Sequence, residues 1–214
     1  LGSFTPEPVR TVVLASGRGT NFQAVLDRVS EGTLPLDVTA LVTNRNDAFA
    51  IERARAAQVP NVHVLPWQRS AQTRAQYDAQ LLETVASERP ELVLLLGWMH
   101  VLDTAFVNAF PELINVHPAF LPLDSSFDVV GVPDGATIPA FRGAHAVSDA
   151  LEALCPWSGA TVHVVRAEAD RGPVLARKPL RIVSGEDEAA LSERLHPIEH
   201  QLLERGIKRW LYER

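Results

Sequence analysis

Short apolar runs alternate with amphipathic segments along the first half of the chain, and this alternation restricts the fold more than any other feature of the sequence. The runs typical of buried strands and the segments with helical spacing follow one another at 9–16, 21–31, 37–43, 47–58, 62–65, 70–88 and 92–96. Right-handed crossovers between parallel strands place helices on both faces of a sheet. The pattern therefore predicts an α/β fold with an open, mostly parallel sheet flanked by helices.

The second half of the chain has a different pattern. Residues 123–142 contain glycines and prolines with little periodicity, which predicts a long loop inserted after the strand that ends near Asn115. A helix, two strands and a C-terminal helix are then expected at 144–154, 160–166, 174–183 and 187–211. We expect the two strands to be antiparallel across the turn at Asp170. This organisation predicts one domain over residues 9–211, with residues 1–8 as a tail or a vector-derived segment.

The composition excludes several classes of partner. The formal net charge of -6 provides no basic field for nucleic acid. The single cysteine, Cys155, excludes an intrachain disulfide and fits a reducing compartment. The longest strongly apolar run, 92–102, is too short to cross a bilayer, and no signal-peptide pattern is present. We therefore expect a cytoplasmic protein without a nucleic acid or membrane partner.

An amide and an imidazole lie two residues apart at the end of an apolar strand. Strand geometry sends the side chains of Asn115 and His117 to the same face. Pro118 lacks the N–H that a sheet ladder needs, so the strand is expected to open into a loop there. Such strand ends are where α/β enzymes place much of their chemistry. A purely structural histidine is the alternative.

A glycine turn, residues 16–21 with the sequence Ser-Gly-Arg-Gly-Thr-Asn, joins the first strand to the first helix. Glycines let the backbone approach a ligand closely, and the N–H groups at a helix start favour an anion, so the expected ligand is a phosphate. The turn is not a P-loop, because the glycine spacing differs and no lysine follows, nor does it complete the dinucleotide fingerprint. The alternative is a tight turn without a ligand.

Two further stretches carry candidate residues. A carboxylate at Asp170 would raise the pKa of His117 if it reached the imidazole. Residues 97–102 leave a buried strand with large apolar side chains and form either part of the core or an aromatic-ligand pocket. His196 and His200 lie at helical spacing, but without a nearby third ligand we predict no metal site.

Four of these segments are together similar to motifs of the phosphoribosylglycinamide formyltransferase family: 16–21, 97–102, 114–122 and 170–173. The similarity extends over about residues 9–210. The Asn-x-His-Pro element with the later Asp-x-Gly-Pro is typical of the folate-dependent formyltransferase superfamily, and the glycine turn and short length select this family within it. The resemblance implies a Rossmann-like formyltransferase fold. It also implies transfer of a formyl group from the co-substrate 10-formyltetrahydrofolate to the amine of 5-phosphoribosylglycinamide (glycinamide ribonucleotide) in purine synthesis.

The resemblance also assigns residues to the two substrates. The ribose phosphate would be bound by Gly19, Thr20 and Asn21. The glycinamide end would be lined by His196, Pro197, Ile198 and Glu199. The folate would be bordered by Arg74, Met99, His100, Val101, Leu102 and Asn115. His100 stands where the family commonly has arginine, which puts one folate carboxylate contact in doubt. The resemblance leaves a homodimer open.

The expected mechanism is direct attack of the amine on the formyl carbon. Asn115 and a charged His117 would stabilise the negative charge that develops on the formyl oxygen. Asp170 would keep His117 protonated and relay a proton from the amine through water. His163, on the neighbouring strand, would support this network. Neither a covalent enzyme intermediate nor a metal is required.

One departure from the family is the insertion at residues 123–142, because family members pass almost directly from Leu-Pro to the aromatic-x-Gly element found here at 141–143. We favour a surface insertion, which loop-closure entropy penalises only slowly, over a lid on the site. Two other functions stay open: a formyltetrahydrofolate hydrolase, with water in place of the amine, and an inactive nucleotide- or folate-binding module. A methionyl-tRNA formyltransferase is not favoured, because it would need a further domain and a basic surface.

Overall fold

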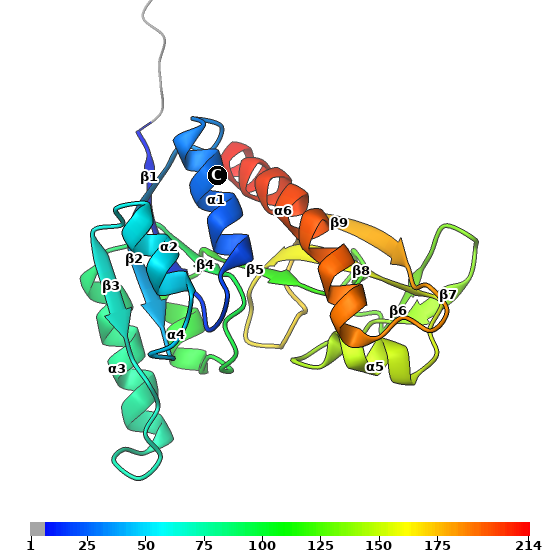
Figure 1. The fold of residues 1–214 in the computed structure, drawn as a ribbon, viewed down its shortest axis with the longest axis horizontal. Helices are drawn as coiled ribbons and strands as arrows, with labels where there is room; N and C mark the ends of the chain where they lie inside the picture. Colours follow the sequence, from blue (N-terminus) through cyan, green and yellow to red (C-terminus); the bar gives the residue numbers. More distant parts are fainter. Residues whose placement is uncertain (1–6) are drawn as a thin grey trace, which may run out of the picture. The chain divides into compact units, whose positions relative to one another are not determined.

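The computed structural model describes residues 7–214, so most of the expected tail at 1–8 lies outside the described residues. The chain divides into two compact units, the first ending at Leu113 and the second running from Ile114 to Arg214. Figure 1 shows the elements of each unit coloured along the sequence. The single-domain interpretation stays a prediction. In the described part of the chain, no helix is long and apolar enough to cross a membrane.

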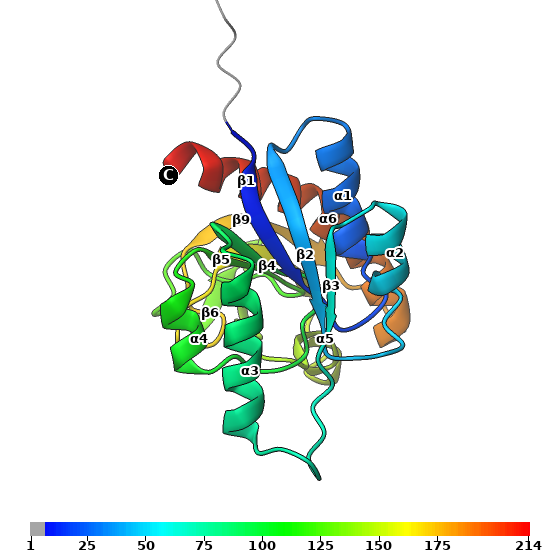
Figure 2. The ribbon, with the colours of Figure 1, turned by 90° about the vertical axis from the view of Figure 1, so that its left-hand side faces the viewer.

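The first unit is a four-stranded parallel sheet with the strand order β3-β2-β1-β4. Its strands are β1 (Val9–Leu14), β2 (Leu36–Thr43), β3 (Asn61–Val64) and β4 (Leu92–Leu95). Its helices are α1 (Thr20–Ser30), α2 (Ala50–Ala56), α3 (Arg74–Ser87) and α4 (Thr104–Ala109). Figure 2 shows α1 and α2 on one face of this sheet and α3 and α4 on the other. The repeated crossover confirms the α/β prediction.

Burial explains why the first unit adopts this arrangement. All four residues of β4 are buried, as expected for a strand covered on both faces. Helix α3 buries Tyr77, Leu81 and Val85, which recur every four residues, and Thr73 with Gln76 forms a capping box at its start. The sequence patterns that predicted these two elements therefore reflect their packing.

The second unit is built on antiparallel strands. Strand β5 (Leu113–His117) pairs with β8 (Trp157–Val164), which pairs with β9 (Val174–Arg181), and both pairings are antiparallel. Helix α5 (Ala146–Glu152) precedes β8, and the long helix α6 (Glu188–Glu213) ends the unit. The predicted late antiparallel strand pair and C-terminal helix are confirmed.

Helix α6 packs closely on the strands of its own unit. A Cβ atom at Gly206 would lie 2.6 Å from Val162 Cγ1, so the absence of a side chain lets the helix approach β8. Leu191, Leu195 and Ile207 are buried along the same helix. Pro197 lies inside the helix without ending it. The helix therefore covers part of the strands that carry the candidate site.

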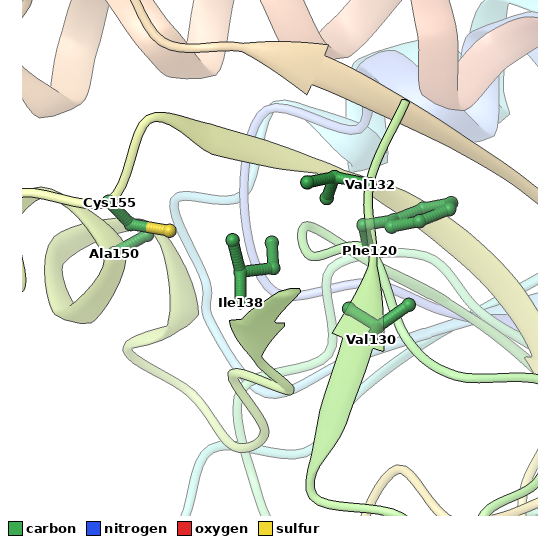
Figure 3. Close-up of a cluster of buried hydrophobic side chains, with 6 residues drawn as sticks. All are labelled: Phe120, Val130, Val132, Ile138, Ala150 and Cys155. Atoms are coloured by element: carbon green, nitrogen blue, oxygen red, sulfur yellow. The ribbon is translucent and has the colours of Figure 1, made fainter. Parts of the chain in front are cut away.

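The insertion at 123–142 is a packed hairpin and not an irregular loop. Strand β6 (Val129–Gly131) pairs antiparallel with β7 (Thr137–Pro139). Figure 3 shows apolar side chains of this hairpin in a cluster with Phe120, which lies shortly after β5. The labelled members are Phe120, Val130, Val132, Ile138, Ala150 and Cys155. The expectation of a loop without secondary structure was wrong for these two strands, because alternate residues bury their side chains in this cluster.

Candidate active site

The candidate active site of the second unit begins with Asn115 and His117 on β5. The antiparallel register places Asn115 opposite His163 and His117 opposite Thr161 on β8. The Asn115 amide nitrogen lies 3.3 Å from Nε2 of His163. The Val164 carbonyl, which can only accept, lies 3.0 Å from Nδ1 of His163 and so favours a proton there. Sheet pairing thus brings an amide and two imidazoles together.

The chain leaves β5 along a fixed path. Thr161 on β8 donates its hydroxyl to the Ala119 carbonyl at 2.7 Å and accepts the Leu121 N–H at 3.0 Å. These bonds satisfy backbone groups after Pro118, where the ladder cannot continue. Thr161 is fully buried, and no local pattern in the sequence indicates this role. The fixed exit holds the end of β5, where His117 lies.

Asp170 reaches both imidazoles from the turn between β8 and β9. One carboxylate oxygen lies 3.6 Å from His117 Nδ1, and the other lies 3.4 Å from His163 Nε2. The Gly143 N–H donates to the same carboxylate at 2.7 Å. The structure therefore brings together all four residues that were predicted on these strands and their turn: Asn115, His117, His163 and Asp170.

Burial and charge act in opposite directions on this cluster. Burial is the largest influence on the pKa of His117 and lowers it, and His163 and Arg142 lower it further. Together they outweigh the Asp170 carboxylate and a hydrogen bond to the Phe141 carbonyl, which raise it. Burial disfavours ionisation of Asp170, but His163, His117 and the Gly143 N–H outweigh it and hold the Asp170 pKa well below its usual value. The net shift of the His117 pKa is therefore downward, although the sequence predicted a rise if Asp170 reached the imidazole. Its cause is the low dielectric around a side chain that is only 5% exposed.

The hydrogen bonds define how His117 can change its charge. Its Nε2 donates to the Phe141 carbonyl at 2.8 Å, which places the proton of the neutral ring on Nε2. Nδ1 then carries a lone pair that faces the Asp170 carboxylate. A second proton at Nδ1 would convert this contact into an ion pair. The arrangement is thus suited to accept a proton and hold it beside a carboxylate.

The glycine turn of the first unit is shaped by its contacts with α2. Gly19 has a φ of +67°, and a Cβ atom there would lie 2.9 Å from Ala50 Cβ. The Gly17 carbonyl accepts the Ala50 N–H at 3.2 Å, and the Arg18 carbonyl accepts from Arg53 Nε at 2.8 Å. Helix α1 begins at Thr20 without a side-chain cap. The turn is thus held from outside, with its helix start available to an anion.

The turn is also joined to the stretch that follows β4. Ser16 donates its N–H to the Gly97 carbonyl at 3.0 Å, and its hydroxyl accepts the Met99 N–H at 3.0 Å. The two loops meet beside β1, where the strand order reverses direction. Ligands of open α/β sheets bind at such switch points. Two of the predicted binding segments of the first unit are therefore neighbours.

The residues predicted to border folate form a mixed surface. Met99 and Val101 are 61% and 80% exposed, whereas His100 is half-buried between the rings of Trp67, Tyr77 and Trp98. Burial, with a smaller effect from Arg74, lowers the pKa of His100. A neutral ring packed among aromatic side chains does not replace the charge of an arginine.

Arg74 and the segment on α6 complete the predicted set. Arg74 binds both oxygens of Asp78, at 2.7 and 2.8 Å, and also the Val101 carbonyl. The α6 segment is one continuous turn, in which Ile198 and Glu199 are buried and Pro197 is exposed. Consecutive helical residues point about 100° apart, so the four members of this turn, His196, Pro197, Ile198 and Glu199, cannot all face one ligand.

Sequence reasoning missed several residues that hold the site. Gly143 belongs to the aromatic-x-Gly element, yet its N–H bond to Asp170 depends on a contact 27 residues away in sequence. Arg142, which donates to the Asp170 carbonyl, and Arg171, the next residue in the chain, were not singled out from the sequence. Within residues 7–214, no group of three or more histidine, cysteine, aspartate or glutamate side chains is placed to hold a metal ion. The predicted lack of a metal stays a prediction.

Comparison with known proteins gives a consistent family. The model described as "Formyl transferase" matches residues 9–125 and 135–207. Phosphoribosylglycinamide formyltransferase of Mycobacterium tuberculosis is 36% identical over 92% of this chain and 82% of its own length. The Escherichia coli protein of the same name is 31% identical over 89% and 82%. Glycinamide ribonucleotide transformylase 1 of Symbiobacterium toebii superposes with a TM-score of 0.81 at 32% identity, over 97% of this chain and 89% of that one.

Proposed function

This chain belongs to the formyl transferase family, among its phosphoribosylglycinamide formyltransferases, and we propose that it transfers a formyl group from 10-formyltetrahydrofolate to the amine of 5-phosphoribosylglycinamide in purine synthesis. The observation that carries this proposal is the cluster of Asn115, His117, His163 and Asp170. It combines a neutral hydrogen-bond donor with a proton acceptor beside a carboxylate. These are the groups that amine attack on a formyl carbon requires.

Asn115 acts on the charge that develops during the reaction. Bound 10-formyltetrahydrofolate supplies the formyl carbon, and attack by the amine lone pair moves the C=O electron pair to the formyl oxygen. The Asn115 amide donates an N–H to that oxygen and lowers the barrier. Its position opposite His163 restricts the amide to one orientation. A fixed donor of this kind needs no rearrangement during the reaction.

His117, with Asp170 beside it, accepts the proton that the attacking amine loses and then passes it on. The attacking nitrogen must lose a proton, and the leaving N10 of the folate must gain one when its bond to the formyl carbon breaks. His117 Nδ1 takes the proton through water and becomes an imidazolium paired with Asp170, 3.6 Å away. The cation then stabilises the neighbouring oxyanion before the proton passes to N10. Asp170 thus stabilises the charged form of His117, which burial alone would disfavour.

The glycine turn binds the ribose phosphate. Gly19 brings the backbone close to the ligand, and Thr20 and Asn21 offer N–H groups at the start of α1. The glycinamide end is lined by those side chains of the turn His196 to Glu199 that share one side of α6. Folate is bordered by the exposed Met99 and Val101 and by Leu102, with Arg74 nearby. His100 contributes ring packing and not a carboxylate contact.

Two other functions make different predictions. A formyltetrahydrofolate hydrolase would use water in place of the amine, and the same oxyanion donors would serve it. A binding module without activity would keep the glycine turn but not need the proton acceptor. The buried His117–Asp170 contact favours a catalyst over a module, because burying such groups without use costs stability. A cytoplasmic location and a homodimer remain proposals.

A kinetic assay separates these functions. Purified protein is incubated with 10-formyltetrahydrofolate, with and without glycinamide ribonucleotide, and tetrahydrofolate release and formylated product are measured. We expect both to appear only when the amine substrate is present. Folate turnover without the amine would favour the hydrolase, and absence of turnover in both mixtures would favour the binding module.

A further inference from the structure

The insertion at 123–142 contains a carboxylate that contacts two arginines beside the candidate reaction centre. The family model leaves residues 126–134 unmatched, and Asp128 lies in that stretch. Its Oδ1 accepts from Arg142 Nη1 at 2.8 Å and from Arg171 Nη2 at 2.5 Å. Both pairs join residues far apart in sequence. One acidic side chain of the insertion therefore holds two cations of the unit.

The same two arginines are held by the backbone of the insertion. Arg142 donates to the Phe127 carbonyl at 2.8 Å, and Arg171 donates to the Ser125 carbonyl at 2.5 Å. Arginine has five N–H donors in a rigid plane, so several acceptors fix its orientation better than one ion pair does. The segment 125–128 therefore holds each of the two guanidinium groups through more than one acceptor.

The arginines in turn hold Asp170 on two sides. Arg171 is the next residue in the chain, and Arg142 Nε donates to the Asp170 carbonyl at 3.4 Å. Gly143, which follows Arg142, donates its N–H to the Asp170 carboxylate at 2.7 Å. Arg142 and the residue that follows it thus contact the backbone and the side chain of Asp170, respectively.

The turn that carries Asp170 needs such support. Asp170 has a φ of +53°, in the left-handed region that costs a non-glycine residue about 1 kcal/mol or more. A Cβ atom at Gly172 would lie 1.6 Å from the Val164 carbonyl oxygen, so the chain there passes directly against β8. A strained turn keeps its conformation only when neighbouring contacts oppose relaxation.

We propose that Asp128 is a positioning residue that, through Arg142 and Arg171, holds the Asp170 carboxylate against His117 and His163. The inference deepens the proposed formyl transfer and rests on it only for the kinetic consequence. It assigns the insertion a role in the site that is neither a neutral surface addition nor a lid. Asp128 itself touches no reacting atom, and its side chain is 73% exposed.

A role limited to stability predicts that loss of Asp128 changes only the free energy of unfolding. Exposed ion pairs contribute little to the free energy of unfolding, so loss of Asp128 should leave the fold intact. A positioning role predicts that the geometry of Asp170 changes while the fold persists. A misplacement well below 1 Å in a catalytic group is enough to reduce a rate severalfold.

The experiment compares three variants with the wild-type protein. Asp128→Ala removes the anchor, Asp128→Glu restores a carboxylate, and Asp134→Ala is the matched control. Asp134 lies in the same hairpin but contacts Trp157 and Arg181. Steady-state kinetics, NMR titration of His117, and hydrogen exchange of the Gly143 amide are measured for each, together with thermal unfolding.

For Asp128→Ala we expect kcat to fall roughly tenfold with KM for both substrates nearly unchanged, because the loss affects the reacting groups and not binding. The Gly143 amide should exchange about tenfold faster, since opening of its bond to Asp170 becomes easier. The titration of His117 should move to lower pH, because Asp170 opposes the effect of burial less well. Asp128→Glu should recover most of each effect, and Asp134→Ala should show none.

Unchanged kcat and unchanged Gly143 exchange in Asp128→Ala would overturn the positioning role. A loss of activity that follows thermal unfolding in both alanine variants would overturn it as well. The exchange and titration measurements need no activity. If the wild-type protein fails to transfer formyl groups but Asp128→Ala still changes both measurements, the proposed function fails and the positioning of Asp170 stands.

Discussion

The two candidate sites differ in which part of the chain forms them. At the glycine turn the shape of the backbone makes the site, and Gly19 combines a φ of +67° with a close approach to Ala50. At β5 and β8 the site is made by side chains, of which His117 and His163 are almost fully buried. The backbone site offers partial charges that do not titrate, whereas the side-chain site changes its protonation.

This difference separates binding from chemistry. A helix start attracts an anion equally in the ground state and the transition state, so its loss should raise KM. Groups that move a proton act only while bonds change, so their loss should lower kcat. Substitutions in the two sites should therefore have different kinetic signatures.

The largest expected effect is on the side-chain site. His117→Ala removes the proton acceptor and should lower kcat by about 10³-fold or more, with a small change in KM for glycinamide ribonucleotide. Steady-state kinetics and a thermal unfolding curve measure the effect. His145→Ala, at an exposed histidine before α5, is the control and should behave as the wild-type protein. A large rise in KM with intact kcat would remove the distinction between the sites.

A smaller effect is expected at the backbone site. Gly19→Ala places a Cβ atom against Ala50 and forces alanine into the left-handed region, at a cost of about 1–3 kcal/mol in the free energy of unfolding. A displaced turn that loses about 1.4 kcal/mol of binding energy should raise KM for glycinamide ribonucleotide about tenfold, with kcat little changed. Denaturant unfolding and kinetics measure both quantities.

Gly32→Ala is the matched control for this substitution. Gly32 has a φ of +73°, but a Cβ atom there meets no atom within 4 Å. Its variant should therefore lose stability from the backbone conformation alone and keep its KM. If Gly19→Ala raised KM for folate as much as KM for glycinamide ribonucleotide, the assignment of the turn to the phosphate would fail.

The two units also differ in how far the sequence predicts them. In the first unit most strands and helices have an apolar pattern of their own, such as the continuous apolar run of β4, so these elements were predicted with shifted ends. Helix α4 was missed because its six residues bury only Phe106 and Val107, which is too short for a pattern. Strands β6 and β7 were missed because each has three residues beside glycine or proline.

The candidate site was partly predictable for a related reason. Spacing along one strand places Asn115 and His117 on the same face, and the antiparallel turn brings Asp170 within reach. Contacts such as Asp128 with Arg171 join residues 43 positions apart and have no local signal. The sequence alone does not show that Asp170 reaches His117 or how deeply the ring is buried, and burial makes the net shift of the His117 pKa downward.

The smallest expected effect is on how the free energy of unfolding depends on pH. It tests the claim that only the side-chain site titrates. Because burial lowers the folded-state pKa of His117 below 6.5, the unfolded state binds more protons as pH falls through that value. The stabilisation from neutral His117 is thus complete above about pH 6.5 and is lost as pH falls towards the folded-state pKa, with a slope of up to about 1.4 kcal/mol per pH unit. His100 contributes in the same sense, and Asp170 adds a further loss only below about pH 3.8.

Denaturant unfolding between pH 7 and pH 5 measures this slope. His117→Gln should flatten the slope, because glutamine binds no proton in either state. His145→Gln should keep the contribution of His117 to the slope. Gly19→Ala should lower the whole curve without changing its slope, since the backbone site carries no titrating group. Parallel curves for wild-type protein and His117→Gln would mean that His117 keeps its ordinary pKa in the folded chain. In that case the effects of burial and of Asp170 would balance, and the ring would be half protonated at about pH 6.5.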